Sequence, residues 1–220
     1  MFIIQSRYVF RQTMLILFLP LILLADQSFA ETKDTENETT RLLILGDSLS
    51  AAYGLQQHEG WVSLLQKRWN EKPLQAEVIN AAISGDTTDG GLSRLPQLLD
   101  THNPSHVLIE LGGNDGLQGH SISKMKNNLH TMIDLAQDSG ATVFLQDMEI
   151  PSNYGKRYTS MFADAFDEVA EKQNIPLIPF FLASIALDKS LMQRDGIHPN
   201  KQAQPLIAEY MDTKLSPLID

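Results

Sequence analysis

The chain has 220 residues, of which 43% are hydrophobic and 20% charged, with 13 Gly, 10 Pro and no Cys. This composition is typical of a single globular domain and excludes collagen-like and low-complexity chains. The formal net charge of −10 argues against a protein whose main partner is a nucleic acid. The lack of cysteine excludes disulfides, thiolate zinc sites and cysteine nucleophiles.

Residues 1–30 are predicted to be a secretory signal peptide. Arg7 and Arg11 precede an apolar run over 14–24, and small residues precede the expected cleavage after Ala30. The run is shorter than the roughly 20 residues that a membrane-spanning helix needs, although an uncleaved anchor is the alternative. The sequence therefore predicts a periplasmic or secreted protein without a stable membrane anchor.

Residues 31–40 are polar throughout and predict a flexible lead, so a single folded domain is expected over 41–220. Five short apolar runs in this domain are typical of strands. They cover residues 42–45, 78–83, 107–111, 143–145 and 177–180. Longer segments with helical spacing follow them. These cover residues 61–70, 91–99, 121–139, 158–173 and 202–215.

The alternation of strands and helices predicts an α/β fold with a parallel sheet of about five strands. Because the strand segments are continuously apolar, we expect helices on both faces of the sheet, in a three-layer α/β/α sandwich. In such sheets ligands bind beyond the carboxyl ends of the strands. Residues that carry chemistry should therefore follow several different strands.

Polar segments occupy these positions. Residues 46–50 follow the first predicted strand, 84–87 the second and 112–116 the third, and 195–200 precede the last helix. Ser48 lies in a predicted strand-to-helix turn, where its hydroxyl can project from the sheet edge and backbone amides can donate to an oxyanion. The alternative is that Ser48 or its neighbour Asp47 caps a helix that begins near Leu49.

The four segments resemble, in content and order, the sequence blocks of the SGNH or GDSL hydrolase family. They read Gly46-Asp47-Ser48-Leu49, then Gly85, then Gly113-Asn114-Asp115, then Asp195-x-x-His198-Pro199. The resemblance spans about residues 42–215 and is greatest to the group of multifunctional thioesterases, lysophospholipases and arylesterases. It implies the flavodoxin-like SGNH hydrolase fold and a serine esterase or thioesterase acting through an acyl-enzyme.

A Ser-His-Asp triad explains why these residue types are needed. A neutral hydroxyl is a poor nucleophile, so Ser48 needs a base, and His198 is the candidate. Asp195, three residues earlier, can accept a hydrogen bond from the other imidazole nitrogen and stabilise the imidazolium. A lone D-x-x-H could equally be a surface turn or half of a metal site, but the other segments favour the triad.

The resemblance also implies an oxyanion hole made by the backbone N–H groups of Ser48 and Gly85 and the side-chain amide of Asn114. Glycine permits close approach to a ligand, and asparagine offers a neutral donor. The alternative for Gly85 and Asn114 is that both serve only the conformation of a turn.

Apolar residues in the loops beside the triad are candidates for a groove that binds an acyl chain, although each could instead pack in the core. They are Ile83, Leu117, Ile150, Pro151 and Tyr154. Residues 116–120 are predicted to form a loop that shifts when an acyl chain enters. The resemblance implies lysophospholipids, fatty-acyl thioesters and aryl esters as substrates.

The other histidines share no spacing typical of metal ligands, and no dinucleotide or phosphate-binding motif occurs, so no metal or organic cofactor is implied. A small-molecule ester or thioester is the expected partner, and the protein is expected to be a monomer. Two alternatives stay open. One is a carbohydrate O-acetylesterase of the same family, and the other is a non-catalytic binding module on the same fold.

Overall fold

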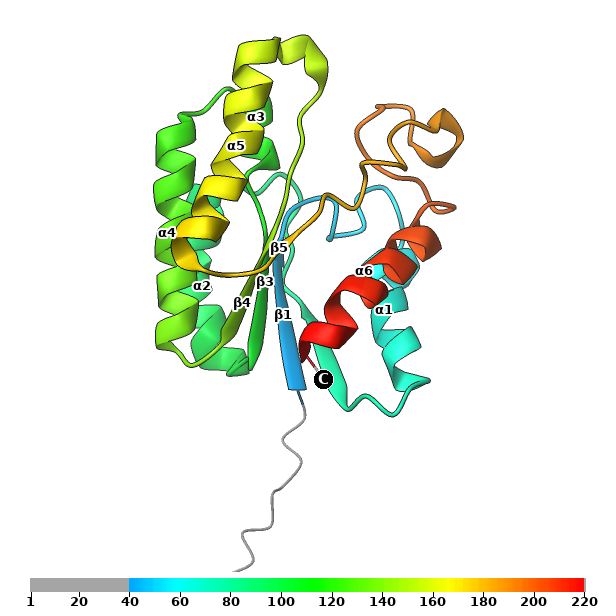
Figure 1. Cartoon of the computed structure of the whole chain (residues 1–220). Coiled ribbons are helices and arrows are strands. Elements are labelled where there is room, and N and C mark those ends of the chain that lie inside the picture. The colour runs from blue at the N-terminus through cyan, green and yellow to red at the C-terminus, as the bar shows by residue number, and fades with distance from the viewer. Residues whose placement is uncertain (1–39, 220) are drawn as a thin grey trace, which may run out of the picture. The chain divides into compact units, whose positions relative to one another are not determined.

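A computed structural model describes residues 40–219, so the predicted signal peptide and almost all of the predicted lead lie outside the described residues. A five-stranded parallel sheet with the order β2-β1-β3-β4-β5 forms the middle layer (Figure 1). The strands are β1 (Thr40–Gly46), β2 (Ala76–Asn80), β3 (His106–Glu110), β4 (Thr142–Gln146) and β5 (Leu177–Ile178). The α/β fold class and the parallel sheet predicted from the sequence are confirmed.

Helices cover both faces of the sheet, as the continuously apolar strands predict. The pair α1 and α6 packs together on one face, while α2, α4 and α5 pack in sequence on the other (Figure 1). The helices are α1 (Trp61–Asn70), α2 (Thr88–His102), α3 (Gly113–Leu117), α4 (Ile122–Asp138), α5 (Lys156–Gln173) and α6 (Gln204–Ile219). No helix within residues 40–219 is both long and apolar enough to cross a bilayer.

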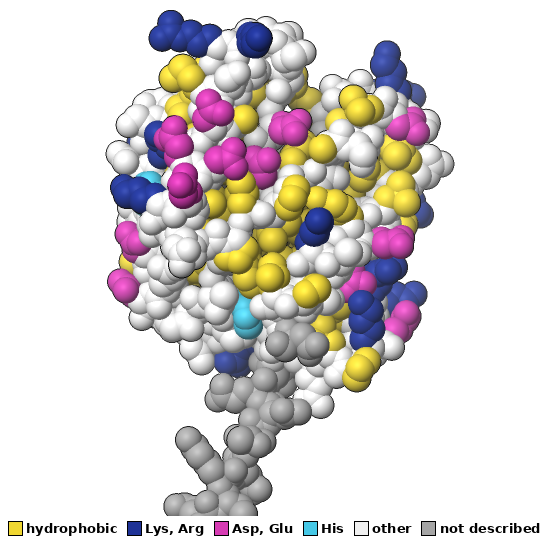
Figure 2. Space-filling model, viewed as in Figure 1, with side chains coloured by type: hydrophobic (Ala, Val, Ile, Leu, Met, Phe, Trp, Pro, Cys, Tyr) yellow, Lys and Arg dark blue, Asp and Glu magenta, His cyan; other side chains and the backbone are white. Residues whose placement is uncertain are grey.

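The centre of the sheet is almost fully buried. In β1, residues 42–45 have no exposed surface, and Leu42 pairs with Val78 of β2 and with His106 of β3. The edge strand β5 is short and is flanked by Pro176 and Pro179, which cannot donate hydrogen bonds to a further strand. Figure 2 shows hydrophobic side chains gathered on the surface between α5 and α6.

One local prediction is wrong. No helix begins near Leu49, because residues 48–54 form consecutive turns after β1. The N–H of Ala51 donates to the carbonyl of Asp47 at 3.0 Å, but Ala52 has a left-handed φ of 58° that ends the helical path. Ser48 therefore lies in a strand-to-turn junction.

The C-terminal helix is held to α1 through Asp212, whose carboxylate is buried. Its oxygens accept hydrogen bonds from Lys72 Nζ at 2.6 Å, from Trp69 Nε1 at 2.9 Å and from Ser216 Oγ at 2.7 Å. Burial raises the pKa of Asp212, but the hydrogen bonds from these groups and from Arg68 outweigh it and lower the pKa from 3.8 to about 2.

We expect Asp212→Asn to lower the free energy of unfolding by about 2 kcal/mol at pH 7, because the amide cannot accept from all these donors. The lowered pKa stabilises the wild-type fold above pH 4, and this stabilisation is lost as the pH falls towards 2. Urea denaturation across this pH range measures both effects. A variant with the wild-type pH dependence would contradict this account of Asp212.

Candidate active site

The polar segments that follow β1, β2 and β3 and the loop before α6 meet at one end of the sheet. There they border a cavity of about 730 Å³, which is lined by Ser48, Gly85, Asn114 and His198 together with apolar side chains. The first three follow three different strands, as expected for a ligand site at the carboxyl ends of a parallel sheet.

Ser48, His198 and Asp195 form a continuous chain of hydrogen bonds. Ser48 Oγ lies 2.8 Å from His198 Nε2, and His198 Nδ1 lies 2.7 Å from Asp195 Oδ2. The other oxygen of Asp195 accepts from the backbone N–H of His198 at 3.0 Å and of Ile197 at 2.9 Å. The whole acid-base pair is therefore organised within one turn of four residues.

This arrangement keeps Asp195 ionised. Burial raises the pKa of the carboxyl, but hydrogen bonds from the backbone and imidazole of His198 and from Ile197 outweigh it and lower the pKa to about 2. An ionised Asp195 fixes the proton of the neutral imidazole on Nδ1, so that Nε2 can accept the proton of Ser48. The geometry is that of a serine nucleophile with an oriented base.

Tyr53 and Gln193 hold the imidazole in place, and no sequence pattern singles these two residues out. The ring of Tyr53 lies against that of His198, with centroids 4.2 Å apart. Gln193 Nε2 donates to the carbonyl of Tyr53 at 2.8 Å, and the N–H of Gln193 donates to the carbonyl of His198 at 2.7 Å. Gln193 thus joins the turn that carries Ser48 to the loop that carries His198.

Three donors border the cavity beside Ser48. Among residues 40–219, the backbone N–H groups of Ser48 and Gly85 donate to no protein acceptor. Gly85 has a φ of 82°, and an added Cβ would meet nothing within 4 Å, so glycine serves this backbone conformation. Asn114 Nδ2 donates to the carbonyl of Asp86 at 2.9 Å and to Asp47 Oδ2 at 3.1 Å.

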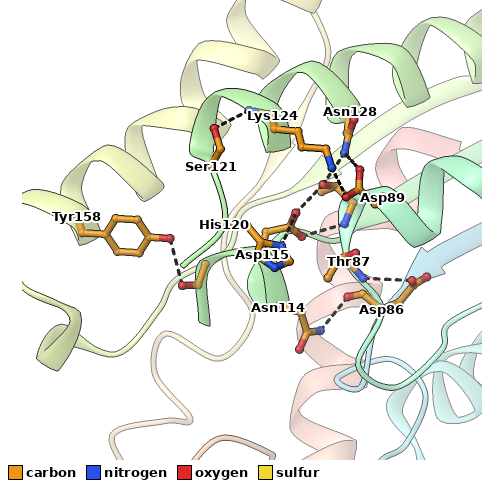
Figure 3. Close-up of polar contacts among 12 residues, drawn as sticks. Asp86, Thr87, Asp89, Asn114, Asp115, His120, Ser121, Lys124, Asn128 and Tyr158 are labelled. Atoms are coloured by element: carbon orange, nitrogen blue, oxygen red, sulfur yellow. Dashed lines mark hydrogen bonds and ion pairs between the residues drawn. The ribbon is translucent and has the colours of Figure 1, made fainter. Parts of the chain in front are cut away.

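A buried polar network fixes the relative positions of these donors. Asp115, next to Asn114 on α3, accepts from the N–H of Thr88 at 2.8 Å and from its hydroxyl at 2.7 Å, and Asn128 of α4 donates to the same hydroxyl at 3.1 Å. Figure 3 shows Asn114 and Asp115 directed from α3 towards the start of α2. The network fixes the segment after Gly85 against α3.

The short helix α3 was not predicted, because its glycine-rich sequence is typical of a turn. Gly112, with a φ of 111°, precedes it, and an added Cβ at Gly116 would lie 2.5 Å from the ring of Phe162. The predicted mobile loop over 116–120 is thus helical as far as Leu117. Only its second half is a turn.

Three of the five predicted groove residues, Leu117, Ile150 and Pro151, line the cavity. Ile83 and Tyr154 do not, and this part of the prediction is corrected. The side chain of Ile83 is 52% exposed at the surface, and Tyr154 donates its hydroxyl to the carbonyl of Leu117 at 2.9 Å. Ile83 precedes the lining residue Ser84, and Tyr154 follows the lining segment 150–152, but neither lines the cavity itself.

Sequence patterns did not indicate one further part of the cavity wall. It consists of apolar residues from the irregular segment after β5, which has no periodic pattern. They are Phe180, Leu182, Ala186, Leu187 and Met192. The rule that ligand sites lie beyond strand ends could have pointed to this segment. Among residues 40–219, no group of three or more His, Asp or Glu side chains is placed to hold a metal ion.

If Asn114 donates to an oxyanion, Asn114→Ala should lower kcat for an aryl ester by about 10²–10³ and change KM little, because the donor acts on the transition state. Steady-state kinetics measure this, and circular dichroism checks the fold. Asn127→Ala, an exposed asparagine on α4, is the matched control. Wild-type kcat in Asn114→Ala would contradict the role.

The fold and the oriented serine define a serine hydrolase of the acyl-transfer class. Residues 44–205 match the GDSL-like lipase/acylhydrolase family, and the chain belongs to this family. The chain is 49% identical to an arylesterase of Vibrio mimicus, with 80% of this chain and 88% of the relative covered. It is 44% identical to thioesterase 1/protease 1/lysophospholipase L1 of Escherichia coli strain K12, covering 81% and 85%.

A solved structure of similar fold is that of the psychrotrophic esterase EstA from Pseudoalteromonas sp., in a form inhibited by monoethylphosphonate. It is 47% identical to this chain and superposes with a TM-score of 0.80, covering 81% of this chain and 98% of the esterase. The resemblance identified from the sequence blocks is therefore confirmed over most of the domain.

Proposed function

We propose that this protein is a serine hydrolase of lipid esters and thioesters, with lysophospholipids, fatty-acyl thioesters and aryl esters as its substrates. The observation that carries the proposal is the hydrogen-bonded chain from Ser48 through His198 to Asp195 at the wall of a cavity with apolar lining. Relatives named as an arylesterase and as a thioesterase and lysophospholipase support the same class of carboxylic-ester and thioester hydrolase.

The reaction has two steps, which are acylation of Ser48 and hydrolysis of the acyl-enzyme. Ser48 Oγ attacks the carbonyl carbon while its proton passes to His198 Nε2, and the oxyanion accepts hydrogen bonds from the N–H groups of Ser48 and Gly85 and from Asn114. Collapse breaks the bond to the leaving group, which takes the proton from His198. Water then attacks the acyl-enzyme, with His198 again the base, and releases the carboxylic acid and free Ser48.

The apolar walls favour an acyl chain over an acetyl group. Leu117, Ile150 and Pro151 line the cavity that Ser48 borders, and Phe180 and Leu182 line it as well. Burial of each further methylene group contributes about 0.8 kcal/mol to transition-state binding when the chain lies in such a groove. A sugar would leave its hydroxyl groups without partners against these walls.

A series of p-nitrophenyl esters from acetate to palmitate tests the proposal. We expect kcat/KM for the octanoate to exceed that for the acetate by at least about tenfold, from methylene burial. Ser48→Ala supplies the background rate. Activity confined to the acetate would overturn the lipid assignment and favour a carbohydrate O-acetylesterase. No activity above background with any ester would favour a non-catalytic binding module.

Export to the periplasm or the medium is part of the same proposal. It is supported by the signal-peptide pattern over residues 1–30, and it makes an extracytoplasmic lipid a better substrate than cytoplasmic acyl-CoA. The intact mass of exported protein tests this, and a mass that includes residues 1–30 would contradict it. A monomer is the proposed state, and sedimentation velocity tests it, with a dimer mass contradicting the proposal.

A further inference from the structure

A fully buried carboxyl group, that of Glu110, lies next to Asp47, whose carboxylate accepts from the Asn114 amide. Glu110 is the last residue of β3 and pairs in register with Gly46 at the end of β1. Its Oε2 accepts from Ser50 Oγ at 2.6 Å and from the N–H of Asp47 at 3.2 Å, whereas its Oε1 is buried without a hydrogen-bond partner. A buried oxygen without a hydrogen-bond partner lowers the stability of a fold, and such atoms are rare in proteins.

The first glycine of the Gly46-Asp47-Ser48 segment makes room for this carboxyl group. A Cβ added at Gly46 would lie 2.5 Å from Glu110 Oε2 and 3.0 Å from Cβ of Ser50. Gly46 is therefore required by the close approach of β3 to the end of β1. The fold places Glu110 against Asp47, one residue before Ser48.

No cation compensates the two carboxyl groups. Within residues 40–219, neither Glu110 nor Asp47 forms a salt bridge with a Lys or Arg side chain. Arg94 of α2 pairs with Asp86 at 2.8 Å and donates to the carbonyl of Gly46 at 3.2 Å. The other titratable groups that face Asp47 are Asp86, after β2, and His198, before α6.

The protonation of the pair follows from these surroundings. Burial, followed by the charge of Asp47, raises the pKa of Glu110 well above its ordinary value. Burial also raises the pKa of Asp47, to about 6, although hydrogen bonds from Leu49 and Glu110 oppose it. Burial without a compensating cation therefore favours a shared proton on the pair, and Glu110, which has no exposed surface, is the better placed of the two to hold it.

Asp47 links this pair to Asn114. Asp47 Oδ2 accepts from Asn114 Nδ2 at 3.1 Å, and Oδ1 accepts from the N–H of Leu49 at 3.0 Å. A fully charged Asp47 would compete with a substrate oxyanion for the amide hydrogen of Asn114, and its charge would oppose the oxyanion directly. A hydrogen bond from a protonated neighbour would weaken both effects.

We propose that Glu110 is a positioning residue that stays protonated and donates its hydrogen to the Asp47 carboxylate, which frees the Asn114 amide for the oxyanion. The proposal rests on the proposed oxyanion role of Asn114. Glu110 acts through Asp47 and touches no substrate. Its loss should therefore change kcat more than KM.

Infrared difference spectra between wild type and Glu110→Gln at pH 7 test the proton without any turnover. We expect the wild type to have the carbonyl stretch of a buried protonated carboxylic acid, and Glu110→Gln to lack it. Ser50→Ala is the matched control and should keep this band, because the hydrogen bond from Ser50 lowers the pKa of Glu110 and its loss favours the protonated form. A difference spectrum with only carboxylate bands would overturn the proposal.

Kinetics test the consequence. Glu110→Met, which has no hydrogen-bonding group at this position, should lower kcat at least about tenfold with KM changed less than about twofold, whereas Glu110→Gln should recover most of that loss. In wild type kcat should fall at alkaline pH as Glu110 ionises, and this limb should vanish in Glu110→Gln. Equal kcat in the two variants, or an unchanged alkaline limb, would overturn the proposal.

The two tests separate the possible failures. If wild type has no esterase activity, the proposed function fails, and the infrared spectra still report whether Glu110 holds a proton. If wild type is an esterase and the carboxylic-acid band is absent, only the inference about Glu110 fails. Should Glu110→Met not fold, Glu110→Gln and the spectra decide the question.

Discussion

Replacing Ser48 with alanine is expected to lower kcat for p-nitrophenyl octanoate by about 10⁶, to near the background rate. The reason is geometric: Ser48 Oγ lies 2.8 Å from His198 Nε2, and no other hydroxyl in the lining has the same contact with an imidazole. The fold should be retained, since the hydroxyl of Ser48 bonds only to His198 among residues 40–219.

Burst and steady-state kinetics measure this loss, with circular dichroism as the check on folding. Ser84→Ala is a matched control, because Ser84 also lines the cavity but has no contact with His198. Ser84→Ala should retain more than about a third of the wild-type kcat. A Ser48→Ala protein with more than about 1% of wild-type activity would contradict the nucleophile assignment.

Asp195→Asn is expected to lower kcat by about 10⁴ and leave the loop folded. The amide oxygen can still accept from the backbone N–H groups of Ile197 and His198, which lie at 2.9 and 3.0 Å. The amide NH₂, however, donates to His198 Nδ1 and so favours the tautomer with its proton on Nε2. In that tautomer the imidazole cannot accept the proton of Ser48.

The pH dependence provides a second measurement on Asp195. Its pKa of about 2 means that the carboxylate stays ionised throughout the range in which the protein is assayed, so an acid limb of kcat reports a group other than Asp195. Asp188→Asn is the matched control, because Asp188 similarly accepts from the backbone N–H of Ser190, at 2.8 Å, outside the site. A loss in Asp195→Asn no larger than in Asp188→Asn would contradict the triad.

The sheet could be predicted because its physical signal is local. Continuous apolar runs such as residues 42–45 need cover on both faces, and the segments between them have helical spacing, so the layers follow from the sequence. The errors occur where backbone conformation decides. The left-handed φ of Ala52 ended a helix expected after Ser48, and the glycine-rich α3 was not predicted.

The three residues of the triad could be predicted for a similar reason. Asp195 and His198 are three residues apart, so their contact depends on one turn, and Ser48 follows a clear strand. Gln193 contacts Tyr53 across 140 residues of sequence, a pairing that only the fold creates. The proximity of Glu110 to Asp47 is also a product of the β1–β3 register, which single-sequence patterns do not specify.

The groove was predicted only in part. Leu117, Ile150 and Pro151 line the cavity, but Ile83 is turned to the surface and the hydroxyl of Tyr154 bonds to the backbone instead. An apolar residue near a site in sequence has no preferred direction until the loop is folded. A further part of the lining comes from an irregular segment after β5, which has no periodic pattern in the sequence.

Ser48 is assigned as the nucleophile of an acyl-transfer reaction. The most direct test of this assignment is to treat the wild-type protein with a fluorophosphonate probe and to map the adduct by peptide mass spectrometry. We expect a single stoichiometric adduct on Ser48, which is absent in Ser48→Ala and forms much more slowly in Asp195→Asn. Failure of the folded wild-type protein to react, or an adduct on another residue, would contradict the assignment.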